Sequence, residues 1–129
     1  MRMRLQLLEE WPQTDVLEAP TLARGMALMQ VRKPDLIVLD LALPDASGLV
    51  GAWRAMKNLG STPVLVLSHG VDRAQAAHLL QMGVMAYLPK ALLASEFLPA
   101  VRSVLAGGRF VSAGLSRRLL GLLANGPGQ

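Results

Sequence analysis

The sequence contains no cysteine, which excludes disulfide bonds, thiolate metal sites and cysteine nucleophiles. Aromatic residues make up only 4% of the chain, so a core must be built mainly from Leu, Val, Ala and Met. The apolar runs, such as 36–39 and 64–67, are far shorter than the roughly 18 residues that cross a membrane. The N-terminus also lacks the long apolar stretch of a secretory signal. These absences predict a cytoplasmic protein that makes no membrane contact.

Acidic residues are absent after Glu96. Residues 1–96 contain nine Lys or Arg and nine Asp or Glu, so the whole net charge of +4 belongs to the arginines that follow. A basic surface can bind nucleic acid, but these arginines are widely spaced, and only Phe110 provides an aromatic ring among them. We therefore expect solvated helix faces here, and no direct nucleic-acid binding by this chain.

Short apolar runs alternate with longer amphipathic stretches through the middle of the chain. The runs 35–40, 63–67 and 85–88 are nearly continuously apolar, as in strands that are buried on both faces of a parallel sheet. The stretches 48–59 and 72–82 between them have helical spacing. Alternating strands and helices predict an α/β fold, a three-layer, doubly wound parallel sheet.

Beyond the third run the pattern is helical. A helix is predicted over 94–106, where the glycines 107–108 end it, and a short amphipathic helix over 113–124. At 129 residues the chain is long enough for one domain and too short for two ordinary ones. We place that domain at 1–112 and treat 113–129 as a C-terminal helix and tail.

The first third of the chain is harder to interpret. Pro20 is well placed in the first turn of a helix over 20–32, and 14–18 has the composition of a short strand. Residues 1–12 fit a helix with one apolar face, but they also fit a strand in which apolar and polar residues alternate. Periodicity alone leaves both alternatives open.

Three polar side chains stand at the ends of the predicted strands. Asp40 ends one strand, Ser68 follows the next, and Lys90 comes two residues after the third. Because the carboxyl ends of parallel strands share one edge of a sheet, we expect these side chains to converge. They would supply a carboxylate nucleophile, a hydroxyl donor and a cation, which together suit an acyl-phosphate site. A lone Asp at a strand end is more often a cap or turn residue, so the prediction depends on all three.

Three segments resemble the signature blocks of response-regulator receiver domains, which have a flavodoxin-like, CheY-like fold. They are PDLIVLDLALPDASGL (34–49), PVLVLS (63–68) and AYLPK (86–90). The segment AVRSVLAGGRFVSAGL (100–115) further resembles the end of receivers that precede a helix-turn-helix DNA-binding domain. The resemblance implies a role in two-component signal transduction, in a phosphorelay that regulates transcription.

The resemblance also implies a role for each site residue. Asp40 would be the phosphoacceptor, taking a phosphoryl group from a histidine kinase with the help of Mg²⁺. Lys90 would pair with the phosphoryl oxygens, and Ser68 would move to hydrogen-bond one of them. Tyr87 matches the aromatic switch residue that turns inward when this hydroxyl is captured, and the carbonyl of Ala42 matches a backbone ligand of Mg²⁺.

The N-terminus departs from the family pattern. Receivers begin with a central strand that ends in two acidic residues, which hold Mg²⁺, and the distance from Met1 to Asp40 is too short for it. If 7–19 is the end of the first helix followed by the second strand, the first strand and its acid pair are missing. If 4–12 is the first strand, then Glu9 or Glu10 belongs to the metal site. The second-strand match favours the first alignment.

Loss of that central strand would leave the strand 35–40 as an open apolar edge. Such an edge favours pairing with another chain. The helix 94–106 offers a second surface of the kind through which receivers dimerise. We therefore expect a homodimer.

Two other classes of function remain open. An aspartate-based phosphatase usually places a second Asp two residues after the nucleophile, where this chain has Ala42, so we do not expect an enzyme. A degenerate, phosphorylation-independent interaction module would use the face formed by 72–106, and loss of the acid pair favours it.

Overall fold

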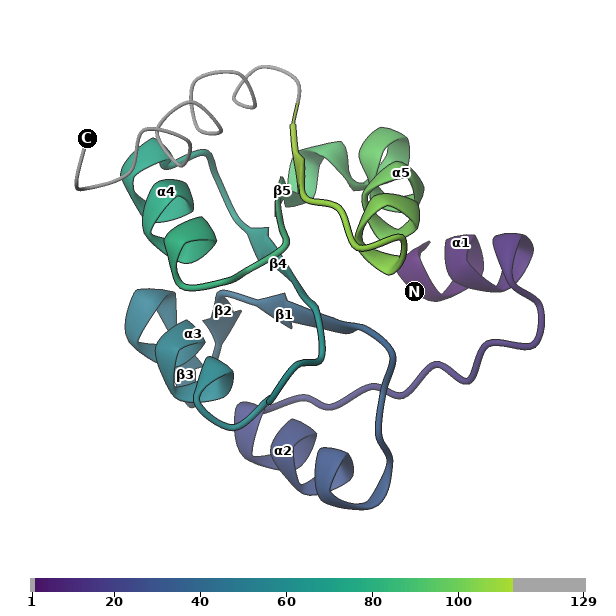
Figure 1. Ribbon diagram of the computed structural model, residues 1–129, viewed down its shortest axis with the longest axis horizontal. Coiled ribbons are helices and arrows are strands. Elements are labelled where there is room, and N and C mark those ends of the chain that lie inside the picture. Colours follow the sequence, from purple (N-terminus) through teal and green to yellow (C-terminus); the bar gives the residue numbers. More distant parts are fainter. Residues whose placement is uncertain (1, 113–129) are drawn as a thin grey trace.

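The computed structural model describes residues 2–112, which are drawn as coloured ribbon in Figure 1. The predicted helix over 113–124 lies outside this range. The helices are α1 (Arg2–Glu10), α2 (Leu22–Val31), α3 (Gly48–Met56), α4 (Arg73–Gln81), η1 (Lys90–Leu92) and α5 (Leu93–Leu105). The strands are β1 (Ile37–Asp40), β2 (Ala42–Leu43), β3 (Ala46–Ser47), β4 (Val64–Ser68), β5 (Ala86–Pro89) and β6 (Phe110–Val111).

The main sheet has four strands in the order β1-β4-β5-β6, and every pair is parallel. The three predicted strands are therefore adjacent and parallel, as expected from their apolar sequences. Strand β6 was not predicted because its two residues are too few for a periodic signal. The strands β2 and β3 form a separate antiparallel pair directly after β1.

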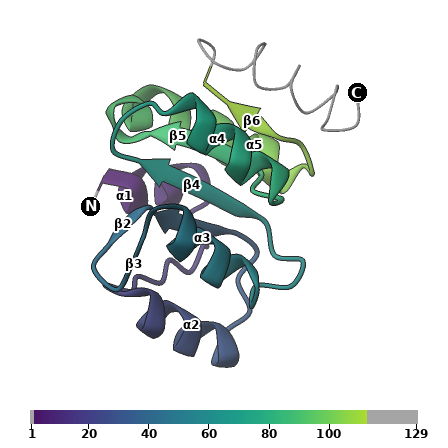
Figure 2. The same ribbon diagram turned by 90° about the vertical axis from the view of Figure 1, so that its left-hand side faces the viewer.

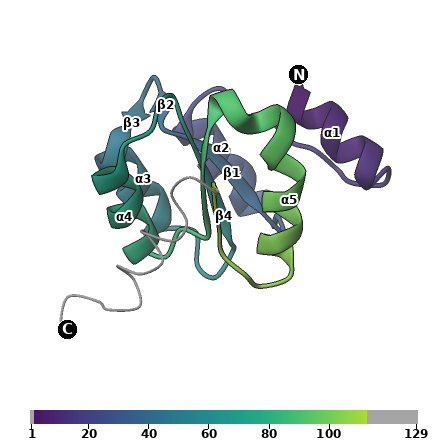
Figure 3. The same ribbon diagram turned by 90° about the horizontal axis from the view of Figure 1, so that it is seen from above.

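Helices cover both faces of the sheet, which confirms the three-layer arrangement. Figure 3 shows α3 and α4 on one side of the sheet and α1 and α5 on the other. Alternate residues of β4 divide between these layers. Val64 and Val66 join the core under α2, α3 and α4, whereas Leu65 and Leu67 pack with Phe97 of α5.

The helix ends follow local signals in the sequence. The Asp72 carboxylate caps α4 by accepting a hydrogen bond of 3.0 Å from the backbone N–H of Gln75. Gly83 adopts a φ of +107° just after α4 ends, a backbone conformation that favours glycine. Thr21 caps α2 in the same way as Asp72 caps α4. The predicted boundaries of these helices are correct to within two residues.

Residues 2–10 are helical, so the alternative that made 4–12 the first strand is wrong. Met3 and Leu7 of α1, with Trp11 just after it, pack against the core cluster that contains Phe97. These three residues are four positions apart, a spacing that places them on one face of a helix. The structure therefore agrees with the helical part of the other alignment, in which 7–19 starts with the end of a helix, but not with its second strand, because residues 2–36 contain no strand.

The prediction of a strand over 14–18 is wrong. This segment has no regular secondary structure, because no neighbouring strand lies beside it to pair with its backbone. Arg4 instead donates a hydrogen bond of 3.2 Å to the carbonyl of Val16 and pairs with the Glu18 carboxylate at 3.0 Å. Residues 11–21 thus form a linker that passes from the face covered by α1 to the face covered by α2 (Figure 1).

Within residues 2–112, strand β1 lies at the edge of the sheet, as the alignment without a first strand predicts. The N–H groups of Ile37 and Leu41 donate to the β4 side, at 2.9 and 3.0 Å. Since the direction of these groups alternates along a strand, the N–H groups of Val38 and Asp40 point to the open side.

Among the described helices, none is long and apolar enough to cross a membrane.

Candidate functional site

Asp40 and Lys90 meet at the carboxyl edge of the sheet. Lys90 Nζ lies 2.8 Å from Asp40 Oδ2, although β4 separates β1, which ends at Asp40, from β5, which Lys90 follows. About a third of each side chain is exposed, at 36% for Asp40 and 33% for Lys90. The carboxylate is thus accessible from solvent and already neutralised by a cation. Two of the three residues predicted to converge are in direct contact.

A tight turn orients the Asp40 carboxylate. The backbone N–H of Ala42 donates to Asp40 Oδ1 at 2.8 Å, which is the bond of an Asx-turn. The β2–β3 hairpin follows directly, and the N–H of Gly48 closes it with a bond of 2.9 Å to the carbonyl of Leu41. The carboxylate therefore has one oxygen bound by the backbone and the other paired with Lys90.

Ser68 ends β4 beside this pair, but its hydroxyl is turned elsewhere. It donates a short hydrogen bond to the carbonyl of Gly70 and accepts a bond of 2.9 Å from the Tyr87 hydroxyl. Within residues 2–112, no hydrogen bond joins Ser68 to Asp40. The sequence placed Ser68 correctly at the strand end, but it gave no information on the direction of the hydroxyl.

Tyr87 is fully buried, and its hydroxyl connects the site to the start of α4. It accepts a hydrogen bond of 3.2 Å from the backbone N–H of Asp72, the residue that caps α4. It also lies 3.2 Å from the carbonyl of Gly70. The sequence did not indicate that Gly70 and Asp72 belong to this network. They take part through backbone atoms, which every residue type has.

The acidic residues suggested as metal ligands lie on a different element. Arg102 of α5 donates from Nε and Nη2 to the two carboxylate oxygens of Glu10, both at 2.8 Å. This hydrogen-bonded pairing lowers the pKa of Glu10 and raises that of Arg102. Because the folded state favours ionised Glu10, the pair stabilises the fold above the ordinary Glu pKa, and that contribution is lost as pH falls through the lowered value.

The residues present do not form a complete Mg²⁺ site. Residues 2–112 contain no group of three or more His, Cys, Asp or Glu side chains that could hold a metal ion. Glu9 and Glu10 end α1, which packs on α5, whereas Asp40 ends a strand of the sheet. Mg²⁺ prefers several oxygen ligands in octahedral geometry, and Asp40 with the carbonyl of Ala42 falls short of that.

Asp45 is a structural residue of this region that the sequence analysis did not single out. Its carboxylate oxygens accept hydrogen bonds from the backbone N–H groups of Leu22 and Ala23, at 2.8 and 3.0 Å. These bonds to the first residues of α2 lower the pKa of Asp45. The turn composition around Pro44 and Asp45 signals a loop, but the partner lies 23 residues away in sequence and cannot be inferred from it.

Comparison with known proteins identifies the family. The model of the response regulator receiver domain matches residues 1–102. The chain belongs to this family. It is 38% identical over 90 residues to the KDP operon transcriptional regulatory protein KdpE of Escherichia coli, covering 70% of this chain and 40% of KdpE. It is 26% identical over 121 residues to the oxygen regulatory protein NreC of Staphylococcus carnosus, covering 91% of this chain and 56% of NreC.

The fold is shared with solved receivers. A LuxR-family two-component response regulator from Aurantimonas superposes with a TM-score of 0.76 at 24% identity, covering 92% of this chain and 86% of that one. The receiver therefore has the flavodoxin-like, CheY-like architecture that its sequence predicts. It spans about half the length of the curated relatives that it matches. Receiver domains are signalling modules of two-component systems, and KdpE is a transcriptional regulatory protein.

Proposed function

We propose that this receiver accepts a phosphoryl group on Asp40 from a histidine kinase and thereby switches a protein-interaction face. The observation that carries the proposal is the 2.8 Å contact between Lys90 and an Asp40 carboxylate that remains partly exposed. A nucleophile with a fixed cation beside it suits attack on an anionic donor, because the cation offsets the charge repulsion. We infer a cytoplasmic protein that is not an enzyme and does not bind nucleic acid through this chain.

The proposed transfer is a single displacement at phosphorus. An oxygen of the Asp40 carboxylate forms a bond to phosphorus, and the bond from phosphorus to the imidazole nitrogen of the kinase phosphohistidine breaks. The imidazole, which carries a proton on its other nitrogen, leaves with that electron pair as a neutral ring, and the product is an acyl phosphate on Asp40. The Lys90 ammonium then pairs with the phosphoryl oxygens. Receivers generally bind Mg²⁺ at an acidic pocket, but the described residues do not complete one, so no step is assigned to the metal.

The switch in this proposal is the network of Ser68 and Tyr87. For Ser68 to reach a phosphoryl oxygen, its hydroxyl must leave the carbonyl of Gly70. The Tyr87 hydroxyl then loses one of its partners, and its bond to the N–H of Asp72 links this change to the first turn of α4. The effect of phosphorylation would thus be transmitted to α4 through two hydrogen bonds of the Tyr87 hydroxyl, one with Ser68 and one with Asp72.

The test is phosphorylation by acetyl phosphate, with and without Mg²⁺, followed by intact-protein mass spectrometry. We expect slow addition of one phosphoryl group that changes little with Mg²⁺. Asp40→Asn should abolish it, and Lys90→Ala should slow it about tenfold or more. Lys33→Ala is the matched control, since Lys33 is an exposed lysine outside the site. Labelling that persists in Asp40→Asn would contradict the proposal, and rapid, strictly Mg²⁺-dependent labelling would contradict the absence of a metal site.

The second candidate is a receiver that works without phosphorylation. It is favoured by the incomplete acid cluster and by a Ser68 hydroxyl already committed to Gly70. In that case neither acetyl phosphate nor a kinase would label Asp40 under any condition tested. The wild-type protein and Asp40→Asn would then bind partners equally.

A further inference from the structure

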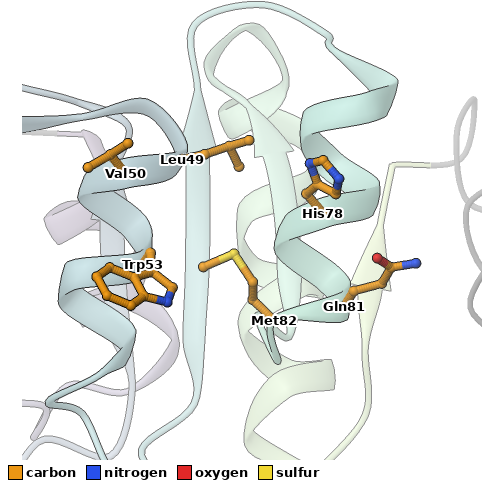
Figure 4. A pocket seen from close by; sticks show the side chains of 6 residues that line it. All are labelled: Leu49, Val50, Trp53, His78, Gln81 and Met82. Atoms are coloured by element: carbon orange, nitrogen blue, oxygen red, sulfur yellow. The ribbon is translucent and has the colours of Figure 1, made fainter.

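An apolar groove lies between α3 and α4, outside the phosphorylation site. Figure 2 shows the two helices next to each other on one face of the sheet. The residues that line the groove are Leu49, Val50, Trp53, His78, Gln81 and Met82. In Figure 4, Leu49 and Met82 point across the groove from opposite helices, and the Trp53 ring lies beside the Met82 side chain.

Two large apolar side chains at this groove are unusually exposed. Val50 is 71% exposed and Trp53 is 52% exposed, although both belong to a helix that packs its other face in the core. Isolated exposed apolar residues are common on protein surfaces, but these two are one helical turn apart and border the same depression. Tryptophan also has the side chain most enriched at binding hot spots.

The two helices that form the groove contain basic residues and no acidic residue. Helices α3 and α4 contain Arg54 and Arg73 and no acidic residue, and Lys57 follows α3. Lys57 Nζ lies 4.3 Å from the centroid of the Trp53 ring, so a cation stands directly on the most exposed aromatic surface. The acids nearest in sequence, Asp45 and Asp72, are both bound to backbone N–H groups at helix starts.

We propose that this groove docks an amphipathic helix with acidic flanks that belongs to a partner protein. Each wall of the groove is a helix of nine residues, roughly 13 Å long, which matches two to three turns of a bound helix. A helix laid between two others buries its apolar stripe against both. Acidic residues beside that stripe would then meet Lys57 and the arginines.

Charge disfavours the two occupants that this chain itself could supply. The sequence after Glu96 has no acid, and Arg117 and Arg118 would bring like charge to the groove. A second copy joined groove to groove would bring together two pairs of helices that contain basic residues and no acidic residue. Both arrangements bring positive charges close to one another, which disfavours binding. An acidic helix brings negative charge to the groove instead.

The test measures binding by fluorescence anisotropy: the full chain is added to a labelled synthetic helical peptide, and binding raises the anisotropy of the label. One peptide carries a leucine stripe at i, i+3, i+4 and i+7 with Glu at its flanks. A matched peptide has Lys in place of Glu. We expect the Glu peptide to bind and the Lys peptide not to bind. Trp53→Ala should weaken binding about tenfold or more, and Lys57→Glu should reverse the preference between the two peptides.

Control variants separate docking from general surface hydrophobicity and from phosphorylation. Val31 of α2 is 80% exposed and lies outside the groove, so Val31→Ala should leave binding unchanged. Asp40→Asn should also bind the Glu peptide normally, which makes this result independent of the proposed function. Circular dichroism checks that every variant is folded.

Four outcomes would overturn the proposal. The first is that the chain binds both peptides equally or binds neither of them. The second is that binding of the Glu peptide is unchanged in both Trp53→Ala and Lys57→Glu. Tighter binding after Leu119→Ser and Leu120→Ser would show that the chain's own C-terminal segment occupies the groove. Light scattering that finds a dimer in the wild type and a monomer in Trp53→Ala would assign the groove to a second copy.

Discussion

The single tyrosine of this receiver illustrates how one side chain serves several elements. Tyr87 sits on β5 with its ring fully buried, and its hydroxyl contacts Ser68 at the end of β4 and Asp72 at the start of α4. A buried hydroxyl without partners would cost free energy, so these hydrogen bonds also fix the side chain in its inward position. Local stability and the proposed switch thus depend on the same atom.

Replacing Tyr87 with Phe tests this network. The ring would remain in the core, but the N–H of Asp72 and the Ser68 hydroxyl would each lose a partner. We expect the free energy of unfolding to fall by about 1–2 kcal/mol, measured by urea denaturation followed by circular dichroism. Ser68→Ala should show part of the same loss, and the double variant should lose less than the sum of the two. An unchanged stability in Tyr87→Phe would mean that these hydrogen bonds contribute nothing net.

At the scale of elements, α3 is held unusually close to the hairpin that follows the phosphoacceptor. A Cβ atom built on Gly51 of α3 would lie 2.2 Å from the carbonyl oxygen of Ala46 in β3. One of these atoms is a Cβ and the other is a backbone oxygen, so rotating a side chain would not relieve the clash. A glycine is therefore required for α3 to pack against the hairpin.

Two Gly→Ala variants give a matched test of this contact. Gly51→Ala should lower the free energy of unfolding by about 1–3 kcal/mol, because the helix must shift away from the hairpin. Gly25 lies in α2, where a Cβ would meet only Ala19 Cβ at an ordinary 3.6 Å. Gly25→Ala should instead stabilise the fold by about 0.5–1 kcal/mol, because alanine favours the helix. Thermal unfolding of both variants checks the opposite signs, and equal effects would contradict the packing argument.

At the scale of the whole molecule, the main sheet has an unpaired apolar edge within the part of the chain that the structure describes, along β1. The linker of residues 11–21 crosses this edge without pairing to it, so it does not act as a substitute strand. Leu36 and Val38 pack against the core cluster under α1 and α5 and are only partly buried. An apolar edge of this kind favours pairing with a second chain. The homodimer expected from the sequence therefore stays a prediction.

A proline placed in β1 would test dimerisation through this edge. The N–H of Val38 points to the open side, so Val38→Pro removes a donor that the existing sheet does not use. We expect the wild type to be dimeric by light scattering at micromolar concentration, and Val38→Pro to be monomeric. Val38→Ala is the control, because it shortens the side chain but keeps the N–H. A dimer that survives Val38→Pro would assign association to another surface, such as α5.

The sequence by itself determined the parts of this protein that depend on local pattern. Continuous apolar runs gave β1, β4 and β5, because strands buried on both faces tolerate few polar residues. Capping and glycine signals gave the limits of α4. The placement of Asp40 and Lys90 at one sheet edge followed from the topology of parallel strands, and the salt bridge between them confirms it.

Only the tertiary structure decided the features that depend on neighbours distant in sequence. Residues 14–18 have a strand-like composition but no strand beside them, and backbone pairing requires that neighbour. Glu10 has the position of a metal ligand in one alignment, yet Arg102 pairs with it because α1 packs on α5. The direction of the Ser68 hydroxyl and the groove beside Trp53 likewise arise from side chains brought together by folding, which no local pattern records.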